Sequence, residues 1–190
     1  MKPTSRVVSA VALAMALPVL GAGAAPAPPG APRAAADEMK ALSWLAGEWE
    51  GEAWIIGPGG QKSTVQQRER VEWKTGGEVL LIQGRGVMRD PQSGEERLVH
   101  DTLATLAWDP GSGRHVMWTY RAGGGPGKPE VTVDGSTVVW GFPVGGSHIR
   151  FTIRRDGEGR WVETGERSAD GTTWTPFFGM TLVRTAPPRD

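Results

Sequence analysis

The stretch Leu42-Ser43-Trp44-Leu45-Ala46-Gly47-Glu48-Trp49-Glu50-Gly51 decides the fold. Met39, Leu42 and Leu45 lie at helical spacing, so a short apolar helix is expected to begin after Asp37 as N-cap and to end at Gly47. From Gly47 onward the chain has the pattern of strands and tight turns as far as the C-terminus. One short helix followed by a long run of strands is typical of a closed antiparallel barrel.

Turn signals recur along the rest of the chain. Gly57-Pro58-Gly59-Gly60, Asp109-Pro110-Gly111 and Asp170-Gly171 are examples, in which glycine allows positive φ and proline fixes φ. The segments between such turns have strand length, and we predict strands at 48–56, 63–74, 78–89, 96–108, 114–121, 130–134, 136–142, 147–155, 160–168 and 174–184. The predicted fold is therefore all-β, an up-and-down antiparallel lipocalin-like barrel of about ten strands with one short N-terminal helix.

A barrel of this size should enclose a cavity, because roughly eight strands already fill the interior with side chains. In segment 63–74 the odd positions Val65, Val71 and Trp73 are apolar and the even positions are mostly polar, so the odd face is expected to point inward. Segments 78–89 and 174–184 are apolar on both faces. We therefore expect the N-terminal helix to cover their outer side.

The two ends of the chain differ from the barrel in composition. Residues 1–24 have the basic start, apolar run and small-residue cleavage site of a signal peptide, so we predict export to the bacterial periplasm or secretion, with no membrane span after removal. Residues 25–36 form a Pro/Ala-rich linker that favours extended structure. The barrel is expected over 37–185, followed by a flexible tail at 186–190.

Charge and cysteine content exclude several classes of function. The full chain carries 21 basic and 21 acidic residues, whereas binding to nucleic acid requires a basic excess. Nucleic acid is therefore not an expected partner. The chain has no cysteine, which excludes disulfides and a thiolate metal site.

The opening pattern Leu42-x-x-Leu45-x-Gly47-x-Trp49-x-Gly51 and a closing pattern resemble an uncharacterised bacterial family of lipocalin-like, or calycin, barrel domains. The closing pattern runs through Trp161-x-Glu163-x-Gly165-Glu166 to Phe177-Phe178-x-Met180-Thr181-Leu182. The resemblance spans about residues 40–184. It implies a barrel with an unassigned internal pocket and no established catalytic residues.

A more distant similarity is to nitrobindin-type haem barrels, which share the Gly-x-Trp-x-Gly opening. They follow it with a glycine-rich Tyr-Pro-Thr element and place an axial histidine on a closing strand. Here Gly51 is followed by Glu52-Ala53-Trp54-Ile55-Ile56, and 174–184 contains no histidine. Haem bound in that manner is therefore not expected, and no cofactor is predicted.

Polar residues on the inward face are the best candidates for ligand contacts. Gln67 and Glu69 share the inward parity of Val65, and a buried carboxylate needs a partner, for which Arg85 or Arg150 is available. The alternatives are a structural ion pair and a wrongly assigned face near the barrel rim. Among nine tryptophans, which more often fill the core or the barrel ends, Trp118 shares parity with Tyr120 on one strand, and this strand is the first candidate for pocket lining. The predicted ligand-binding residues are Gln67, Glu69, Trp73, Arg85, Trp118, Tyr120, Arg150 and Glu163.

Patterns for catalysis or metal binding are missing from the sequence. There is no His-Glu-x-x-His or comparable zinc spacing, and no metal site is predicted. Gly146-Ser147-His148 is not a nucleophile elbow. The run Gly123-Gly124-Gly125-Pro126-Gly127-Lys128-Pro129 lacks the Ser/Thr and the helix of a P-loop, so we interpret it as a flexible loop.

The function predicted from the sequence is binding of a small, mostly apolar or aromatic molecule by an exported barrel, without chemistry and without catalytic residues. One alternative is a filled barrel that acts as an interaction module, meeting another envelope protein or a second copy as a homodimer. Another is a lipocalin-like enzyme that uses Glu69 or Glu163 as an acid/base.

Overall fold

The computed structural model describes residues 35–188, so the predicted signal peptide and most of the predicted linker lie outside the described residues. The chain begins with α1 (Ala35–Met39), which continues as the 3₁₀ helix η1 (Lys40–Leu45). The helix thus starts two residues before the predicted barrel boundary at 37, within what the sequence suggested as linker. Asp37 lies in its first turn rather than at the N-cap.

Ten strands follow, close to the predicted segments. They are β1 (Gly47–Ile56), β2 (Lys62–Lys74), β3 (Val79–Arg89), β4 (Glu96–Asp109), β5 (Arg114–Arg121), β6 (Glu130–Asp134), β7 (Thr137–Val144), β8 (Ser147–Arg155), β9 (Trp161–Ser168) and β10 (Thr175–Ala186). A short 3₁₀ turn, η2 (Thr75–Gly77), joins β2 to β3.

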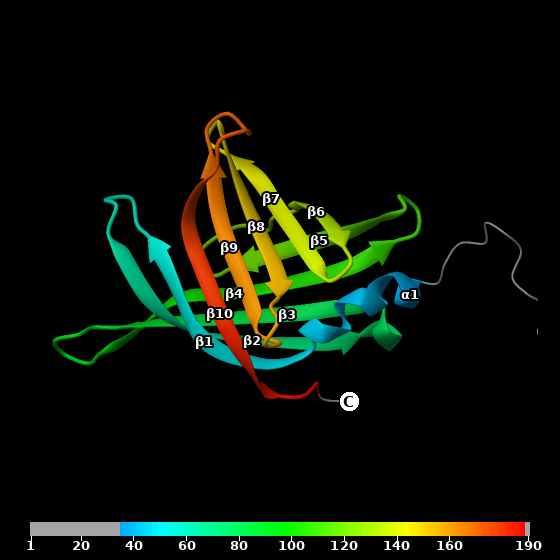
Figure 1. Ribbon diagram of the computed structural model, residues 1–190, viewed down its shortest axis with the longest axis horizontal. Coiled ribbons are helices and arrows are strands. Elements are labelled where there is room, and N and C mark those ends of the chain that lie inside the picture. The colour runs from blue at the N-terminus through cyan, green and yellow to red at the C-terminus, as the bar shows by residue number, and fades with distance from the viewer. Residues whose placement is uncertain (1–34, 189–190) are drawn as a thin grey trace, which may run out of the picture. The chain divides into compact units, whose positions relative to one another are not determined.

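The strands form one antiparallel sheet in the order β5-β4-β3-β2-β1-β10-β9-β8-β7-β6 (Figure 1). Each strand except β5 pairs with the next strand in sequence, and β10 pairs with β1. At the seam between the edge strands β5 and β6, Thr119 of β5 and Gly127, which precedes β6, exchange backbone hydrogen bonds of 2.9 and 2.7 Å. The prediction of an up-and-down barrel is confirmed, with a seam between β5 and β6 that is nearly closed.

The N-terminal helix closes one end of this barrel. Leu42 and Leu45 of η1 are fully buried. The indole rings of Trp44, Trp49 and Trp161 pack edge to face around them, with centroids 5.9 to 6.2 Å apart. The Nε1 atom of Trp49 donates a hydrogen bond of 2.8 Å to the carbonyl of Leu45. These three tryptophans, here called the tryptophan plug, seal the end of the barrel where α1 lies in Figure 1.

This position of the helix corrects one prediction. The helix does not lie over the outer faces of the segments at 78–89 and 174–184, and Val183 on β10 is 52% exposed. The apolar character of both faces of β10 therefore reflects exposed side chains, not a covering helix.

Gly47 connects the helix to the barrel. Its φ of +132° is one that L residues rarely adopt, and a Cβ there would collide with the Arg184 side chain and the carbonyl of Ala186. The same Arg184 guanidinium donates to the carbonyls of Trp44 and Ala46 and lies 4.2 Å over the ring of Trp49. Only glycine fits where this C-terminal arginine holds the tryptophan plug.

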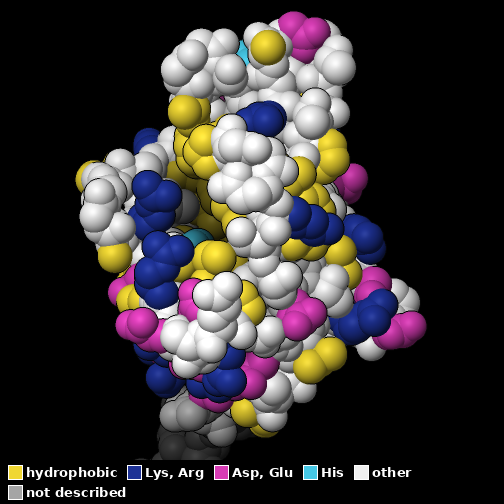
Figure 2. Space-filling view, turned by 90° about the vertical axis from the view of Figure 1, so that its left-hand side faces the viewer, with side chains coloured by type: hydrophobic (Ala, Val, Ile, Leu, Met, Phe, Trp, Pro, Cys, Tyr) yellow, Lys and Arg dark blue, Asp and Glu magenta, His cyan; other side chains and the backbone are white. Residues whose placement is uncertain are grey.

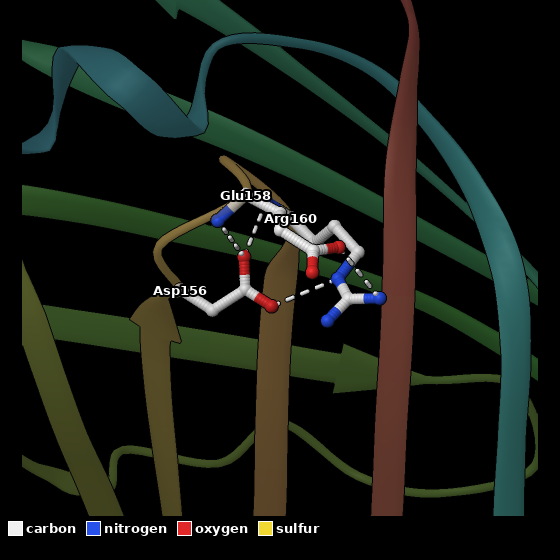
Figure 3. A network of polar contacts seen from close by, with 3 residues as sticks. All are labelled: Asp156, Glu158 and Arg160. Carbon is white, nitrogen blue, oxygen red and sulfur yellow. Dashed lines mark hydrogen bonds and ion pairs between the residues drawn. The ribbon is translucent and has the colours of Figure 1, made fainter.

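A polar network fixes the β8–β9 turn. The carboxylate of Asp156 accepts backbone N–H bonds from Glu158 and Arg160, and the Arg160 guanidinium donates to it at 2.8 Å (Figure 3). The Arg160 side chain is the main reason that the pKa of Asp156 lies below its usual range. An Asp that accepts bonds from its own turn sets the register of the two strands.

The opposite end of the barrel is the mouth, formed by the β1–β2, β3–β4, β7–β8 and β9–β10 turns and by segment 122–129. The apolar side chains of Ile55 and Phe142, at the ends of β1 and β7 near the mouth, are more than one-third exposed there. Figure 2 shows a hollow in the molecule with hydrophobic side chains in its wall and basic side chains around it. Within residues 35–188, no helix is long and apolar enough to cross a membrane.

The tryptophan plug predicts a large difference between two tryptophan substitutions. Trp49→Ala removes a fully buried ring and its hydrogen bond, and should lower the free energy of unfolding by about 3 to 5 kcal/mol. Trp118→Ala, which truncates an exposed ring, should change it by less than about 0.5 kcal/mol. Urea denaturation followed by circular dichroism measures both. If the two substitutions lowered the free energy of unfolding equally, the tryptophan plug would not be a main source of the stability of the barrel.

Candidate ligand-binding site in the barrel interior

Two polar side chains on β2 point into the barrel, as predicted. Gln67 and Glu69 are both more than 90% buried, and they alternate with the exposed Arg68 and Arg70. Gln67 donates a hydrogen bond of 2.7 Å from its Nε2 atom to the carboxyl Oε1 of Glu69. A neutral amide is thus the bonded partner of this carboxyl, rather than an arginine.

Two glycines on the next strand make room for this pair. Gly84 lies opposite Glu69 and Gly86 opposite Gln67 in the register of β2 and β3. A Cβ at Gly84 would lie 2.7 Å from the Glu69 Oε1 atom, and one at Gly86 would lie 2.5 Å from the Gln67 Oε1 atom. Such separations are too short for non-bonded atoms, so the glycines allow the polar side chains to lie across β3.

The polar wall continues onto β4. Thr102 is paired with Gly84, and its hydroxyl would also lie 2.7 Å from a Cβ at that glycine. The hydroxyl of Thr102 is 3.1 Å from the Nε2 atom of His100. Burial, followed by the nearby charge of Arg121, lowers the pKa of His100, which favours the neutral imidazole.

A second carboxyl lies on the other side of the interior. Glu163 of β9 is 8% exposed, and its position on the strand lies between the buried residues Trp161 and Gly165. The buried Nε1 atoms of Trp140 and Trp161 have no hydrogen-bond partner. Both indoles nevertheless lie close enough to Glu163 to act as donors toward its carboxyl, which offsets part of the rise in its pKa. The carboxyl and the two indole N–H groups thus form a second polar cluster that faces the interior.

Burial dominates the electrostatics of both carboxyls. Desolvation raises the pKa of Glu69 to about 8, although the bond from Gln67 opposes the change and the charge of Glu163 adds to it. Desolvation likewise raises the pKa of Glu163 to about 7. No ion pair in the described part of the chain involves either group. At neutral pH the Glu69 carboxyl is therefore mostly protonated and the Glu163 carboxyl is only partly ionised, with the indole N–H groups of Trp140 and Trp161 beside it.

The two arginines predicted as partners of Glu69 lie elsewhere, which corrects that prediction. Arg85 is exposed on the outer face of β3, where its neighbours across the strands are Arg68 and Asp101. Arg150 on β8 forms an ion pair of 2.7 Å with Glu166 and stacks 3.9 Å over the ring of Trp174. It lines a surface groove of about 360 Å³ beside Gly141 rather than the Glu69 site.

The two aromatic residues of β5 that were predicted to line the pocket project outward instead. Trp118 and Tyr120 are 42% and 46% exposed, whereas their neighbour Met117 is buried against Leu106 of β4. The inward residues of this strand are therefore Met117 and Thr119. Trp73, the last predicted aromatic, is partly buried against the core beside η2.

The structure thus brings together Gln67, Glu69 and Glu163 from the predicted set. Sequence reasoning missed His100, Thr102, Trp140 and Trp161, which complete the polar wall. The alternation Gly84-x-Gly86 was a usable signal, because glycines at alternate positions of a strand mark space for side chains from a neighbouring strand. Residues 35–188 contain no group of three or more His, Cys, Asp or Glu side chains arranged for a metal ion.

Comparison with known proteins supports the fold. No family model matches the chain, and no curated protein matches its sequence. The structure of Rv2717c from M. tuberculosis superposes with a TM-score of 0.54 at 16% identity, covering 77% of this chain and 96% of that one. The S-type phycobiliprotein lyase CPES from Guillardia theta gives a TM-score of 0.53 at 14% identity, covering 80% and 93%. At these identities the likeness establishes a calycin-like barrel fold.

The raised pKa of Glu69 predicts a specific pH dependence of stability. The folded state holds a proton that the unfolded state releases near pH 4.5, so stability should fall as pH rises from about 4.5 to about 8 and then level off. Glu69→Gln keeps the shape of the side chain but removes its ionisable carboxyl. We expect it to match the native chain near pH 4 and to be more stable by a few kcal/mol above pH 8.

Denaturant melts between pH 4 and 9 measure this difference. Glu163 remains in the variant, so part of the fall between about pH 4.5 and 7 should persist. Parallel curves for the native chain and Glu69→Gln would show that Glu69 ionises normally and that its surroundings are not dry.

Proposed function

We propose that this barrel binds a small, mostly apolar molecule in its interior without transforming it. The observation that carries the proposal is the set of buried polar side chains that face the interior. The Gln67–Glu69 pair lies on one wall, and Glu163 lies on another with the indole N–H groups of Trp140 and Trp161 beside it. Buried carboxyls without a cationic partner are unusual in a plain core, and a small-molecule site is a common reason for them.

The walls of the interior suit an apolar body. The ring of Trp140 stacks on Phe151 with centroids 4.3 Å apart, and Phe178 meets Phe151 edge to face at 5.8 Å. A pocket with mostly apolar walls and a few convergent polar groups is the usual form of a small-molecule site.

The polar groups of the interior suit binding of a hydrogen-bond acceptor. A protonated acid and indole N–H groups all donate hydrogen bonds, and such a set holds a carbonyl, ether or similar acceptor in place.

The N-terminal sequence supports the further proposal that the barrel works in the bacterial periplasm or outside the cell. Residues 1–24 have the pattern of a cleaved signal peptide. The mature protein recovered from the cell envelope should begin at Ala25, as read by N-terminal sequencing. Full-length protein in the cytoplasmic fraction would contradict export.

Substitutions at two adjacent residues of β5, one inward and one outward, test where a ligand binds. N-phenyl-1-naphthylamine is a neutral probe that becomes fluorescent in apolar surroundings, and we expect it to saturate one site per chain. Thr119→Trp fills the interior and should reduce its affinity at least about tenfold, the effect of losing about 1.4 kcal/mol of binding energy. Trp118→Ala, on the outer face, should leave the affinity unchanged.

Fluorescence titration gives both affinities, and near-ultraviolet circular dichroism checks that each variant keeps the native fold. If Thr119→Trp left the affinity for the probe unchanged and Trp118→Ala abolished binding, the site would lie on the outer surface, and the proposal would be contradicted.

A further inference from the structure

Three arginines occupy inward positions at the mouth. Residues that pair across antiparallel strands project from the same face of the sheet. Arg121 on β5 pairs with the inward Thr102, and Arg97 on β4 pairs with Met88, which packs against the core. Arg167 on β9 lies two residues beyond the inward Gly165. Together Arg97, Arg121 and Arg167 are named the arginine rim.

The arginine rim has no counter-charge within the chain. No ion pair within 4 Å involves any of its members in the described residues. Some outer-face arginines are paired, as Arg89 is with Glu96 at 2.8 Å and Arg68 with Glu50 at 3.3 Å, whereas Arg85 forms no ion pair in the described part of the chain. What distinguishes the rim is the inward position of its arginines at the mouth. The positive charge of the rim is therefore available to a molecule outside the chain, and Figure 2 shows basic side chains around the hollow.

One acidic residue lies near the rim and its charge is already engaged. Arg167 lines a groove of about 440 Å³ together with Ser147, Asp170 and other polar residues. The Asp170 carboxylate accepts backbone bonds of 2.8 and 2.7 Å from Thr172 and Thr173 and a bond from the Ser168 hydroxyl. These bonds hold the pKa of Asp170 far below its usual range, and they orient its oxygens toward its own turn.

The charge of the rim reaches the polar wall. Burial is the main cause of the lowered pKa of His100, and the charge of Arg121 contributes to it, whereas Asp101 opposes that change. Deeper in the interior, burial raises the pKa of Glu69 to about 8 and that of Glu163 to about 7, so neither carboxyl is fully ionised at neutral pH. The interior below the rim therefore carries less negative charge than two ordinary carboxylates would give.

We propose that the ligand of this barrel is an anionic amphiphile, whose carboxylate, sulfonate or phosphate head binds the arginine rim while its apolar body extends to Trp140 and Phe151. This inference rests on the proposed function and names the class of molecule that the same interior takes. Guanidinium groups suit the head because they donate charge-assisted, often bidentate bonds to oxyanions. A cationic amphiphile would instead have to pass three unpaired positive charges.

A pair of fluorescent probes tests the head group directly. 8-Anilinonaphthalene-1-sulfonate has the ring system of N-phenyl-1-naphthylamine with an added sulfonate. We expect the sulfonate probe to bind more tightly, and Arg121→Gln or Arg97→Gln to weaken its binding about tenfold or more, because each substitution removes a charge-assisted hydrogen bond to the sulfonate. The neutral probe should bind each variant as it binds the native chain.

Arg114→Gln is the matched control, because Arg114 is exposed at the other end of the same strand, beside the tryptophan plug. It should change the affinity for neither probe. Added salt should weaken only the sulfonate probe, because partly exposed ion pairs are screened.

The outcomes separate this inference from the proposed function. If the neutral probe binds and the sulfonate probe binds no more tightly, or is unaffected by loss of Arg97 and Arg121, the anionic class is wrong and interior binding stands. If neither probe saturates a site that Thr119→Trp removes, interior binding itself fails. If Arg114→Gln weakened binding of the sulfonate probe as much as the rim substitutions do, the effect would come from net charge, and the arginine rim would not be the binding site of the head group.

Discussion

The edge-to-face packing of Trp44, Trp49 and Trp161 is the interaction on which the rest of the structure depends. It anchors η1 against the first and ninth strands and closes one end of a barrel whose other end stays open. Arg184, near the C-terminus, lies over Trp49 and binds the carbonyls that end the helix. The N-terminal and C-terminal parts of the described chain thereby meet at the plug, where β10 pairs with β1. The barrel is sealed at this end and bounded by turns at the other, and the proposed binding function depends on this asymmetry.

Sealing the interior also sets its chemistry. Glu69 and Glu163 are buried without a cation, so burial raises the pKa of each carboxyl, to about 8 and about 7. Gln67 donates a hydrogen bond to Glu69 on one wall, and the indole N–H groups of Trp140 and Trp161 lie beside Glu163 on the other. Buried carboxyls without a cationic partner destabilise the fold. Their presence is consistent with the proposed binding of a molecule that enters from the mouth.

Much of the fold could be predicted because turn residues and alternation are local properties. Glycine, proline and aspartate clusters mark almost every strand end, and the parity of Val65, Gln67, Glu69 and Val71 gave the correct inward face of β2. The face of β5 could not be found in this way, because Val116, Met117, Trp118 and Tyr120 include apolar residues of both parities. Its orientation depends on the pairing of Met117 with Leu106 of β4, which is a tertiary property. The unpartnered state of Trp140 and Trp161 and the unpaired state of the arginine rim likewise depend on groups distant in sequence.

The central claim is that the barrel interior is a dry, cation-free space that a ligand can enter. Carbon-13 NMR of the glutamate side-chain carboxyls between pH 3 and 10 tests it directly. Two resonances, assigned by Glu69→Gln and Glu163→Gln, should titrate near pH 8 and pH 7. Both should shift when a saturating apolar probe is added. Titration of both carboxyls near pH 4.5, with no response to the probe, would show a wet or filled interior and contradict the claim.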